Sequence, residues 1–168
     1  MHPRVVIWSL WDGEKKMKSR ELKSIFEQLR EKKKMYLPEP ATEEQISDFE
    51  REHSIFLPAK YREWLLLCDG GELYLPAGIQ FYGVAHKPVI DVDDDDRPDE
   101  SYIVIGTLAS GDPIVFEKDK ESISVYNHED DRIEEDETYE DFYAFLDDLN
   151  NILGIGGWFY VKKNLWIQ

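Results

Sequence analysis

The spacing of apolar residues along the chain changes from a helical repeat to an alternating one at Asp69-Gly70-Gly71. Before this point apolar residues recur every three or four positions, which predicts helices with one buried face. One such face would be formed by Tyr61, Trp64, Leu65 and Cys68. After it, short runs of β-branched and aromatic residues are separated by turn residues, which predicts strands. Helices and strands in separate blocks predict an α+β fold.

Two helices are expected directly before this change of spacing. Thr42-Glu43-Glu44-Gln45 is a capping box, in which the first hydroxyl accepts from the fourth N–H and the fourth side chain reaches back. Pro58 suits the entry of the second helix, where its missing N–H is not needed. Gly70-Gly71 is expected to end that helix in the left-handed conformation. A further, basic amphipathic helix is predicted over Lys18–Lys34, either packed at the domain edge or lying on a membrane surface.

Short strands and one more helix are predicted after the second helix. The strands are Leu73–Leu75, Ile79–Tyr82, Tyr102–Leu108, Ile114–Glu117 and Ser122–Tyr126. Ser110-Gly111-Asp112 predicts a hairpin turn between two of them. The last helix is predicted to start at Thr138, whose hydroxyl would cap it, and to bury Phe142, Phe145, Leu146, Leu149 and Leu153. The ends of the chain carry two more candidate strands, Arg4–Trp11 and Trp158–Val161.

The charge of the chain is large and unevenly distributed. Its 168 residues include 20 Lys+Arg and 36 Asp+Glu, a formal net charge of −16. Residues 1–35 carry a net charge of +5, and residues 36–168 carry −21. Two segments are densely acidic: Asp91–Glu100 has seven acids in ten residues, and Glu129–Asp141 has nine in thirteen. Because like charges at this density repel one another, both segments are predicted to lie mostly in solvated loops.

This composition favours some partners and locations over others. A strongly acidic chain is unsuited to general nucleic-acid binding, which needs Lys and Arg, and is suited to a basic protein partner. The single cysteine, Cys68, cannot form an internal disulfide or a cysteine-based zinc site, which fits a reducing cytoplasm. The longest apolar stretch, Ile152–Val161, has ten residues against the roughly 20 that a spanning helix needs. We therefore expect a cytoplasmic protein that does not bind nucleic acid or membranes.

The residues that carry chemistry form no recognisable catalytic, metal or cofactor motif. No pair of the four histidines has a metal-binding helical spacing. The run Asp93–Asp96 lacks the glycine and the terminal glutamate of an EF-hand loop. The glycines that follow residue 153 come after a predicted helix and so cannot cradle a phosphate at its start. We expect no enzymatic activity, no catalytic residue, no metal site and no cofactor.

The order of these elements resembles the SUKH superfamily, which contains fungal cell-wall (glucan) synthesis regulators and many bacterial immunity proteins. The resemblance lies in the acidic helix Thr42–His53, the Leu57–Leu65 segment with its Leu-Pro and Tyr-Arg pairs, and the Asp69-Gly70-Gly71 stop. Ile103–Gly106 with the following turn, and the aromatic helix Tyr139–Leu149, resemble the later parts of the family pattern.

The chain length predicts a single domain, and the order of the elements predicts helices packed on one side of a mostly antiparallel central sheet, a SUKH-like fold. The resemblance concerns part of this domain. It covers a core of about residues 37–150 and leaves two extensions outside the usual domain. Residues 1–36 would form a basic strand-helix extension, and residues 151–168 a C-terminal one. The extensions would either enlarge the sheet or serve as a docking device, and the structural role is favoured.

For function the resemblance implies binding and not catalysis. Bacterial members are thought to neutralise toxins, many of them nucleases or deaminases, and the acidic composition fits such a basic partner. The alternative is a regulatory or scaffold module in cell-wall assembly or signalling. The acidic segments would supply the contacts, or else serve only solubility. The candidate partner-binding residues are Asp91, Asp93, Asp94, Asp95, Asp96, Glu129, Asp130, Asp131, Glu134, Glu135, Asp136 and Glu137.

Overall fold

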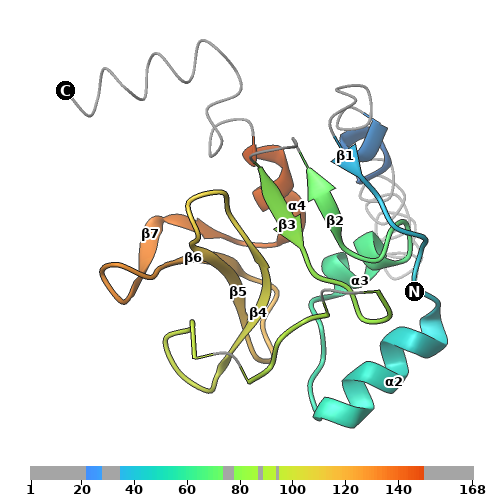
Figure 1. Cartoon of the computed structure of the whole chain (residues 1–168), viewed down its shortest axis with the longest axis horizontal. Helices are drawn as coiled ribbons and strands as arrows, with labels where there is room; N and C mark the ends of the chain where they lie inside the picture. The colour runs from blue at the N-terminus through green and yellow to red at the C-terminus, as the bar shows by residue number, and fades with distance from the viewer. Residues whose placement is uncertain (1–21, 28–34, 74–77, 87–88, 94, 150–168) are drawn as a thin grey trace, which may run out of the picture.

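The computed structural model describes residues 22–27, 35–73, 78–86, 89–93 and 95–149. These residues form one seven-stranded sheet in which every pair of neighbouring strands is antiparallel (Figure 1). The strands follow one another across the sheet in chain order. They are β1 (Met35–Tyr36), β2 (Gly71–Leu73), β3 (Ile79–Phe81), β4 (Tyr102–Thr107), β5 (Pro113–Glu117), β6 (Ile123–Asn127) and β7 (Arg132–Tyr139).

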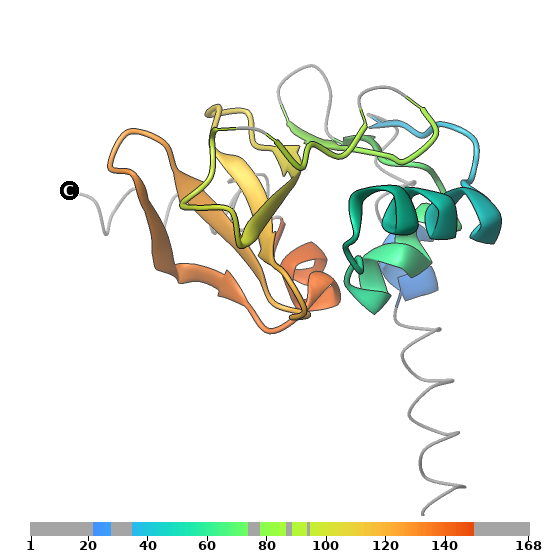
Figure 2. The ribbon, with the colours of Figure 1, turned by 90° about the horizontal axis from the view of Figure 1, so that it is seen from below.

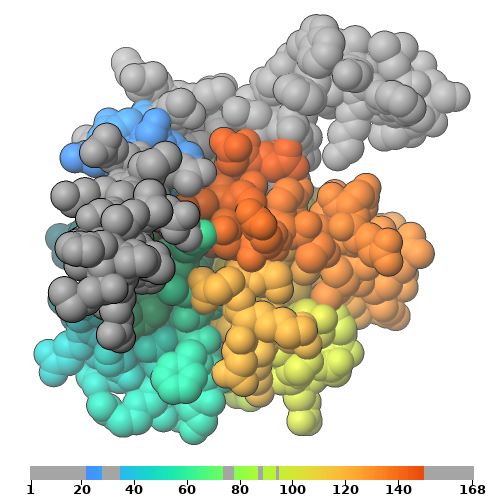
Figure 3. All heavy atoms as spheres, turned by 180° about the vertical axis from the view of Figure 1, so that it is seen from behind, coloured from blue at the N-terminus to red at the C-terminus, as the bar shows by residue number. Residues whose placement is uncertain are grey.

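The helices lie on one side of this sheet. They are α2 (Glu43–His53), α3 (Ala59–Leu65), α4 (Phe142–Asp147) and the helical residues 22–27. Figure 2 shows α2, α3 and α4 on the same side of β2 and β3. Figure 3, seen from behind, shows α4 in orange-red between the teal helices and the orange strand β7. The predicted α+β class, with an antiparallel sheet and helices on one side, is confirmed.

The start of α2 is the predicted capping box. The Gln45 backbone N–H donates to the Thr42 hydroxyl at 3.1 Å, and the Thr42 N–H donates to the Gln45 side chain at 2.9 Å. These bonds satisfy two amides that have no partner inside the helix. Ile46 and Phe49 are buried on the face that points to the core, as the spacing predicted.

Helix α3 supplies the centre of the core. All four residues of its predicted apolar face are buried, and the Trp64 ring lies 5.7 Å from Phe81 and 5.8 Å from Phe142. Phe26, from the predicted basic helix, contacts the same indole at 5.7 Å. Because Trp64 touches three separate elements of the chain, it ties the sheet, α4 and the helical residues 22–27 together. Its indole N–H donates to the carbonyl of Gly70 at 3.0 Å.

Asp69 is a buried carboxylate that organises the chain just after α3. Its side-chain oxygens accept the backbone N–H groups of Val84, Ala85 and His86 at 2.7–2.8 Å. The His86 ring Nδ1 lies 2.8 Å from the same carboxylate. A Cβ at Gly83 would come within 2.5 Å of this side chain, so the approach requires glycine. A single buried charge therefore fixes the turn that leaves β3.

Two local predictions were wrong in detail. Helix α3 ends at Leu65 with a right-handed C-cap at Leu66, whereas Gly70 and Gly71 have φ of +95° and +117° at the entry of β2. The last helix begins at Phe142, and its N-cap is Asp141, whose carboxylate accepts from the Ala144 N–H at 2.8 Å. Thr138 instead belongs to β7, because its backbone pairs with Ser124.

The segment Glu129–Asp141 was predicted to be mostly loop, and this was also wrong, because eight of its residues form β7. An edge strand needs a single hydrogen-bonded neighbour and can leave its charged side chains in solvent, so the repulsion that disfavours a central strand is tolerated there.

The predicted strands Arg4–Trp11 and Trp158–Val161, and the buried position assigned to Leu153, lie outside the described residues.

The cap of α4 provides a stability test. Asp141 also pairs with Lys60 on α3, and both side chains are more than four-fifths buried. We expect Asp141→Ala to lower the free energy of unfolding by about 2 kcal/mol, because it removes an N-cap and a charge-assisted bond. Urea denaturation followed by circular dichroism measures this loss. Asp147→Ala is the matched control on the exposed end of the same helix, and an equal loss there would contradict the assignment.

Candidate protein-binding surface

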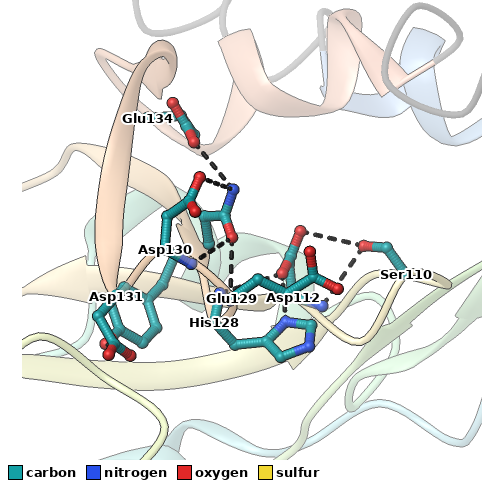
Figure 4. A network of polar contacts seen from close by, with 9 residues as sticks. Ser110, Asp112, His128, Glu129, Asp130, Asp131 and Glu134 are labelled. Atoms are coloured by element: carbon teal, nitrogen blue, oxygen red, sulfur yellow. Dashed lines mark hydrogen bonds and ion pairs between the residues drawn. The ribbon is translucent and has the colours of Figure 1, made fainter.

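The turn between β6 and β7 is built around Asn127. Its side-chain oxygen accepts the N–H groups of Glu129 and Asp130 at 3.0 and 3.1 Å (Figure 4). Asp131 then takes a left-handed φ of 53°, which asparagine and aspartate tolerate better than most residues. The three carboxylates that follow Asn127 are all exposed, as predicted for Glu129, Asp130 and Asp131.

Strand β7 carries a wide bulge that holds the second half of this acidic segment. Ile133 pairs with Tyr126 and Thr138 pairs with Ser124, so the four residues Glu134–Glu137 lie opposite Val125 alone. Glu135 and Asp136 are exposed, whereas Glu134 and Glu137 are half-buried. The Asn127 amide donates to Glu134 at 3.0 Å and so links the bulge to the turn. A bulge turns side chains away from the regular strand alternation and hinders pairing of the edge with another strand.

The other acidic segment is mostly loop, as predicted. Asp91 forms an isolated antiparallel bridge with Val104 of β4, and its carboxylate accepts the N–H of Asp93 at 2.9 Å. At the far end the Asp99 carboxylate accepts the Ser101 N–H at 2.7 Å, and bonds from Ser101 lower the pKa of Asp99. Asp93, Asp95 and Asp96 are exposed and Asp91 is half-buried. Asp94 lies outside the described residues.

The two acidic segments act on the same side chains. The Tyr126 hydroxyl donates to Asp131 at 3.1 Å. The pKa of Tyr126 is raised, first by burial, then by Asp131 and then by the charge of Asp96 from the other segment. Asp96 also contributes to the electrostatic environment of His128. Asp131 of one predicted patch and Asp96 of the other therefore both act on Tyr126 of β6, and we treat the two patches together. We call them the acidic surface, which comprises Asp91, Asp93, Asp95, Asp96, Glu129, Asp130, Asp131, Glu134, Glu135, Asp136 and Glu137.

A link that the sequence did not predict holds this surface against the neighbouring hairpin. Asp112, in the turn between β4 and β5, bonds to the His128 ring Nδ1 and accepts the His128 backbone N–H at 3.2 Å. Ser110 donates to the other oxygen of Asp112 at 3.2 Å. Gly111 has φ of +93° in this turn, and the hairpin predicted there is confirmed. Asp112 and His128 lie 16 positions apart, and only the pairing of β5 with β6 brings them together.

This link predicts that the stability of the protein depends on pH. The pKa of His128 is raised, chiefly by its bond to Asp112 and further by the charges of Asp112, Glu129 and Asp96. A raised pKa in the folded state means that the pair stabilises the fold fully below about pH 6.5, the ordinary histidine value, and loses this effect as pH rises through the folded pKa. We expect the His128 ring to titrate above this value by NMR and to return to it in Asp112→Asn. An unchanged pKa in that variant would contradict the link.

The Cys68 thiol is free and buried. Burial, with the Asp69 charge as a second cause, raises the pKa of the Cys68 thiol to about 12, so it is protonated at neutral pH. Among the described residues, no three His, Cys, Asp or Glu side chains form a group that could hold a metal ion. Nor is any helix among them long and apolar enough to cross a lipid bilayer.

Comparison with known proteins bears on the part of the chain that carries these features. No curated protein matches the sequence. A family model described as SMI1 / KNR4 family (SUKH-1) matches residues 40–148. The matched region begins two residues before the capping box of α2, runs through strands β2–β7 and the acidic surface, and ends directly after α4. Because the match covers well over half of the chain and all of these elements, the protein belongs to the SMI1/KNR4 (SUKH-1) family.

Proposed function

We propose that this protein is an immunity protein that neutralises a basic toxin, of the nuclease or deaminase type, by stoichiometric binding. Its family consists in general of non-catalytic immunity or regulatory modules. The observation that carries the proposal is the acidic surface, in which Asp131 of the β6–β7 hairpin bonds to Tyr126 and the charge of Asp96, from the loop before β4, acts on Tyr126 and His128.

The chemistry of such a toxin explains why an acidic surface would suit it. An enzyme that acts on nucleic acid needs basic residues around its active site to neutralise phosphates. Carboxylates held at a fixed position can bind those basic residues in place of the phosphates of the substrate. Opposite charges also steer the encounter and raise association rates by about 10- to 1,000-fold over a neutral pair.

The arrangement of the acidic surface favours binding over simple solubility. Several of its carboxylates are held in position by hydrogen bonds: Asp131 by Tyr126, Glu134 by Asn127 and Asp91 by Asp93. Charges fixed in this way lose less conformational freedom when a partner binds than charges on freely moving side chains would lose. A surface that served only solubility would not need them fixed.

The experiment that tests this function uses the full chain as bait. The tagged protein is mixed at low ionic strength with an extract of its source cells, and bound proteins are released by salt and identified by mass spectrometry. Each recovered basic protein is then purified and assayed for activity with increasing amounts of this chain. Inhibition that is complete at a 1:1 ratio supports the immunity role.

Two outcomes would contradict that role. Weak binding to several cell-wall or signalling proteins, with no inhibition, would identify the protein as a regulatory or scaffold module. Binding that does not weaken as salt is raised would show that the acidic surface is not the contact, since exposed charges are screened within about 8 Å at physiological ionic strength.

A further inference from the structure

The sheet has a second apolar cluster on the face turned away from the helices. Val104 of β4 pairs with Val115 of β5, and both are buried. Neither belongs to the core that contains the helices; they form a separate cluster with Tyr126 of β6. Tyr82, Tyr102 and Ile133 are half-buried and pack against this cluster. We call these six residues the tyrosine face.

Two of the three tyrosines on this face are fixed by their hydroxyl groups. The Tyr82 hydroxyl lies 2.6 Å from that of Thr107, and the Tyr126 hydroxyl donates to Asp131 at 3.1 Å. Tyr102 lies directly opposite Glu117 across the β4–β5 pair. Aromatic rings that are already ordered lose little conformational entropy when they bind a partner, so such rings make good contact points in protein interfaces.

Carboxylates from three elements act on two of these rings, Tyr102 and Tyr126. Asp131 comes from the β6–β7 turn, Glu117 from the end of β5 and Asp99 from the loop before β4. The pKa of Tyr102 is raised by burial, and then by the charges of Glu117 and Asp99. Two cations also lie here. Lys120 pairs with Glu117 at 2.6 Å, and Arg97 donates to the Tyr102 carbonyl at 2.7 Å.

We propose that the tyrosine face is the specificity element of the acidic surface and that it binds arginine side chains of a protein partner. The flat guanidinium group can stack on a tyrosine ring while its N–H groups donate to the carboxylates around it. Lysine has the same charge but a compact ammonium group that cannot stack in this way. The inference rests on the proposed function, since it names which basic residues of the partner the acidic surface selects.

The test compares two probes of equal charge, an acetylated hexa-arginine peptide amide and its hexa-lysine counterpart. Titrations of the full chain, with ¹³C-labelled tyrosine rings, are followed by NMR and calorimetry at low ionic strength. We expect the arginine peptide to shift the ring signals of Tyr82, Tyr102 and Tyr126 and to bind roughly 2- to 5-fold more tightly than the lysine peptide, the range of one exposed cation–π contact.

Variants at Tyr102 assign this preference to the face. Tyr102→Leu keeps an apolar side chain and removes the ring, so it should abolish the preference for arginine. Tyr102→Phe keeps the ring and should retain the preference for arginine. This variant is used in place of Tyr102→Leu if the leucine variant does not fold. Tyr36→Leu is the matched control, because Tyr36 is 61% exposed on the edge strand β1, three strands away from β4.

The outcomes separate this inference from the proposed function. Equal affinity for the two peptides, or a preference that survives in Tyr102→Leu, would overturn the role of the tyrosine face and leave the acidic surface intact. Failure of both peptides to bind at low ionic strength would instead contradict the electrostatic contact on which the proposed function depends.

Discussion

Replacement of Asp69 by alanine is expected to lower the free energy of unfolding by about 3–5 kcal/mol, enough to unfold a marginally stable domain. The side chain of Asp69 is fully buried and accepts three backbone N–H groups from residues 84–86, besides its contact with the His86 ring. Alanine would leave these partly buried donors without a partner and a cavity where the buried carboxylate was, and each unsatisfied donor that is buried costs about 1–3 kcal/mol. Urea denaturation followed by tryptophan fluorescence measures the loss.

The control for this variant is Asp95→Ala, which removes an exposed carboxylate and should change stability by less than about 0.5 kcal/mol. Asp69→Asn should fall between the two, because the amide keeps one acceptor oxygen and places an NH₂ group against backbone donors. If Asp69→Ala unfolded at the same urea concentration as the Asp95 variant, the carboxylate would not organise the turn after β3.

Neutralising the acidic surface is expected to slow association with a basic partner by about 10- to 1,000-fold at low ionic strength. The dissociation rate should change much less, because charges at the rim of an interface act mainly on the encounter. Stopped-flow or surface plasmon resonance measurements over a range of salt concentrations separate the two rates. The variant replaces six exposed acids by their amides: Asp93, Asp95, Asp96, Glu129, Asp130 and Glu135.

A matched control changes the net charge equally while leaving the acidic surface intact. It replaces six exposed acids elsewhere by their amides: Glu39, Glu44, Glu52, Asp119, Glu140 and Asp147. This control should associate faster than the first variant and keep the stronger dependence on salt. Equal rates for the two variants would mean that only net charge matters and that the partner does not bind at the acidic surface.

Features whose causes lie within a few residues could be predicted from the sequence. The capping box at Thr42 depends on four consecutive residues, and the buried face of α3 depends on spacing along one helix. The turn at Ser110-Gly111-Asp112 depends on a glycine with positive φ. Neighbours elsewhere in the fold do not alter such signals, so these predictions were confirmed.

Features that depend on pairing between distant segments could not be predicted in the same way. The acids of β7 discourage a strand locally, yet β6 provides hydrogen bonds along one edge and the bulge at Glu134–Glu137 places charge in solvent. The bond between Asp112 and His128 exists only because two hairpins lie side by side. Thr138 and Asp141 are both good helix caps, and the pairing of Thr138 with Ser124 decided between them.

The order of the strands also bears on how the chain folds during synthesis. From β4 to β7 each strand pairs with the one before it across a short turn, so these hairpins can form as they leave the ribosome, without closing long loops. Helix α3 is different, because the aromatic contact of Trp64 with Phe142 and the ion pair of Lys60 with Asp141 join residues about 80 positions apart. At a synthesis rate of about 5–20 residues per second, the apolar face of α3 stays uncovered by α4 for several seconds. A nascent chain of this protein should therefore bind chaperones most strongly after α3 has emerged and release them when α4 arrives.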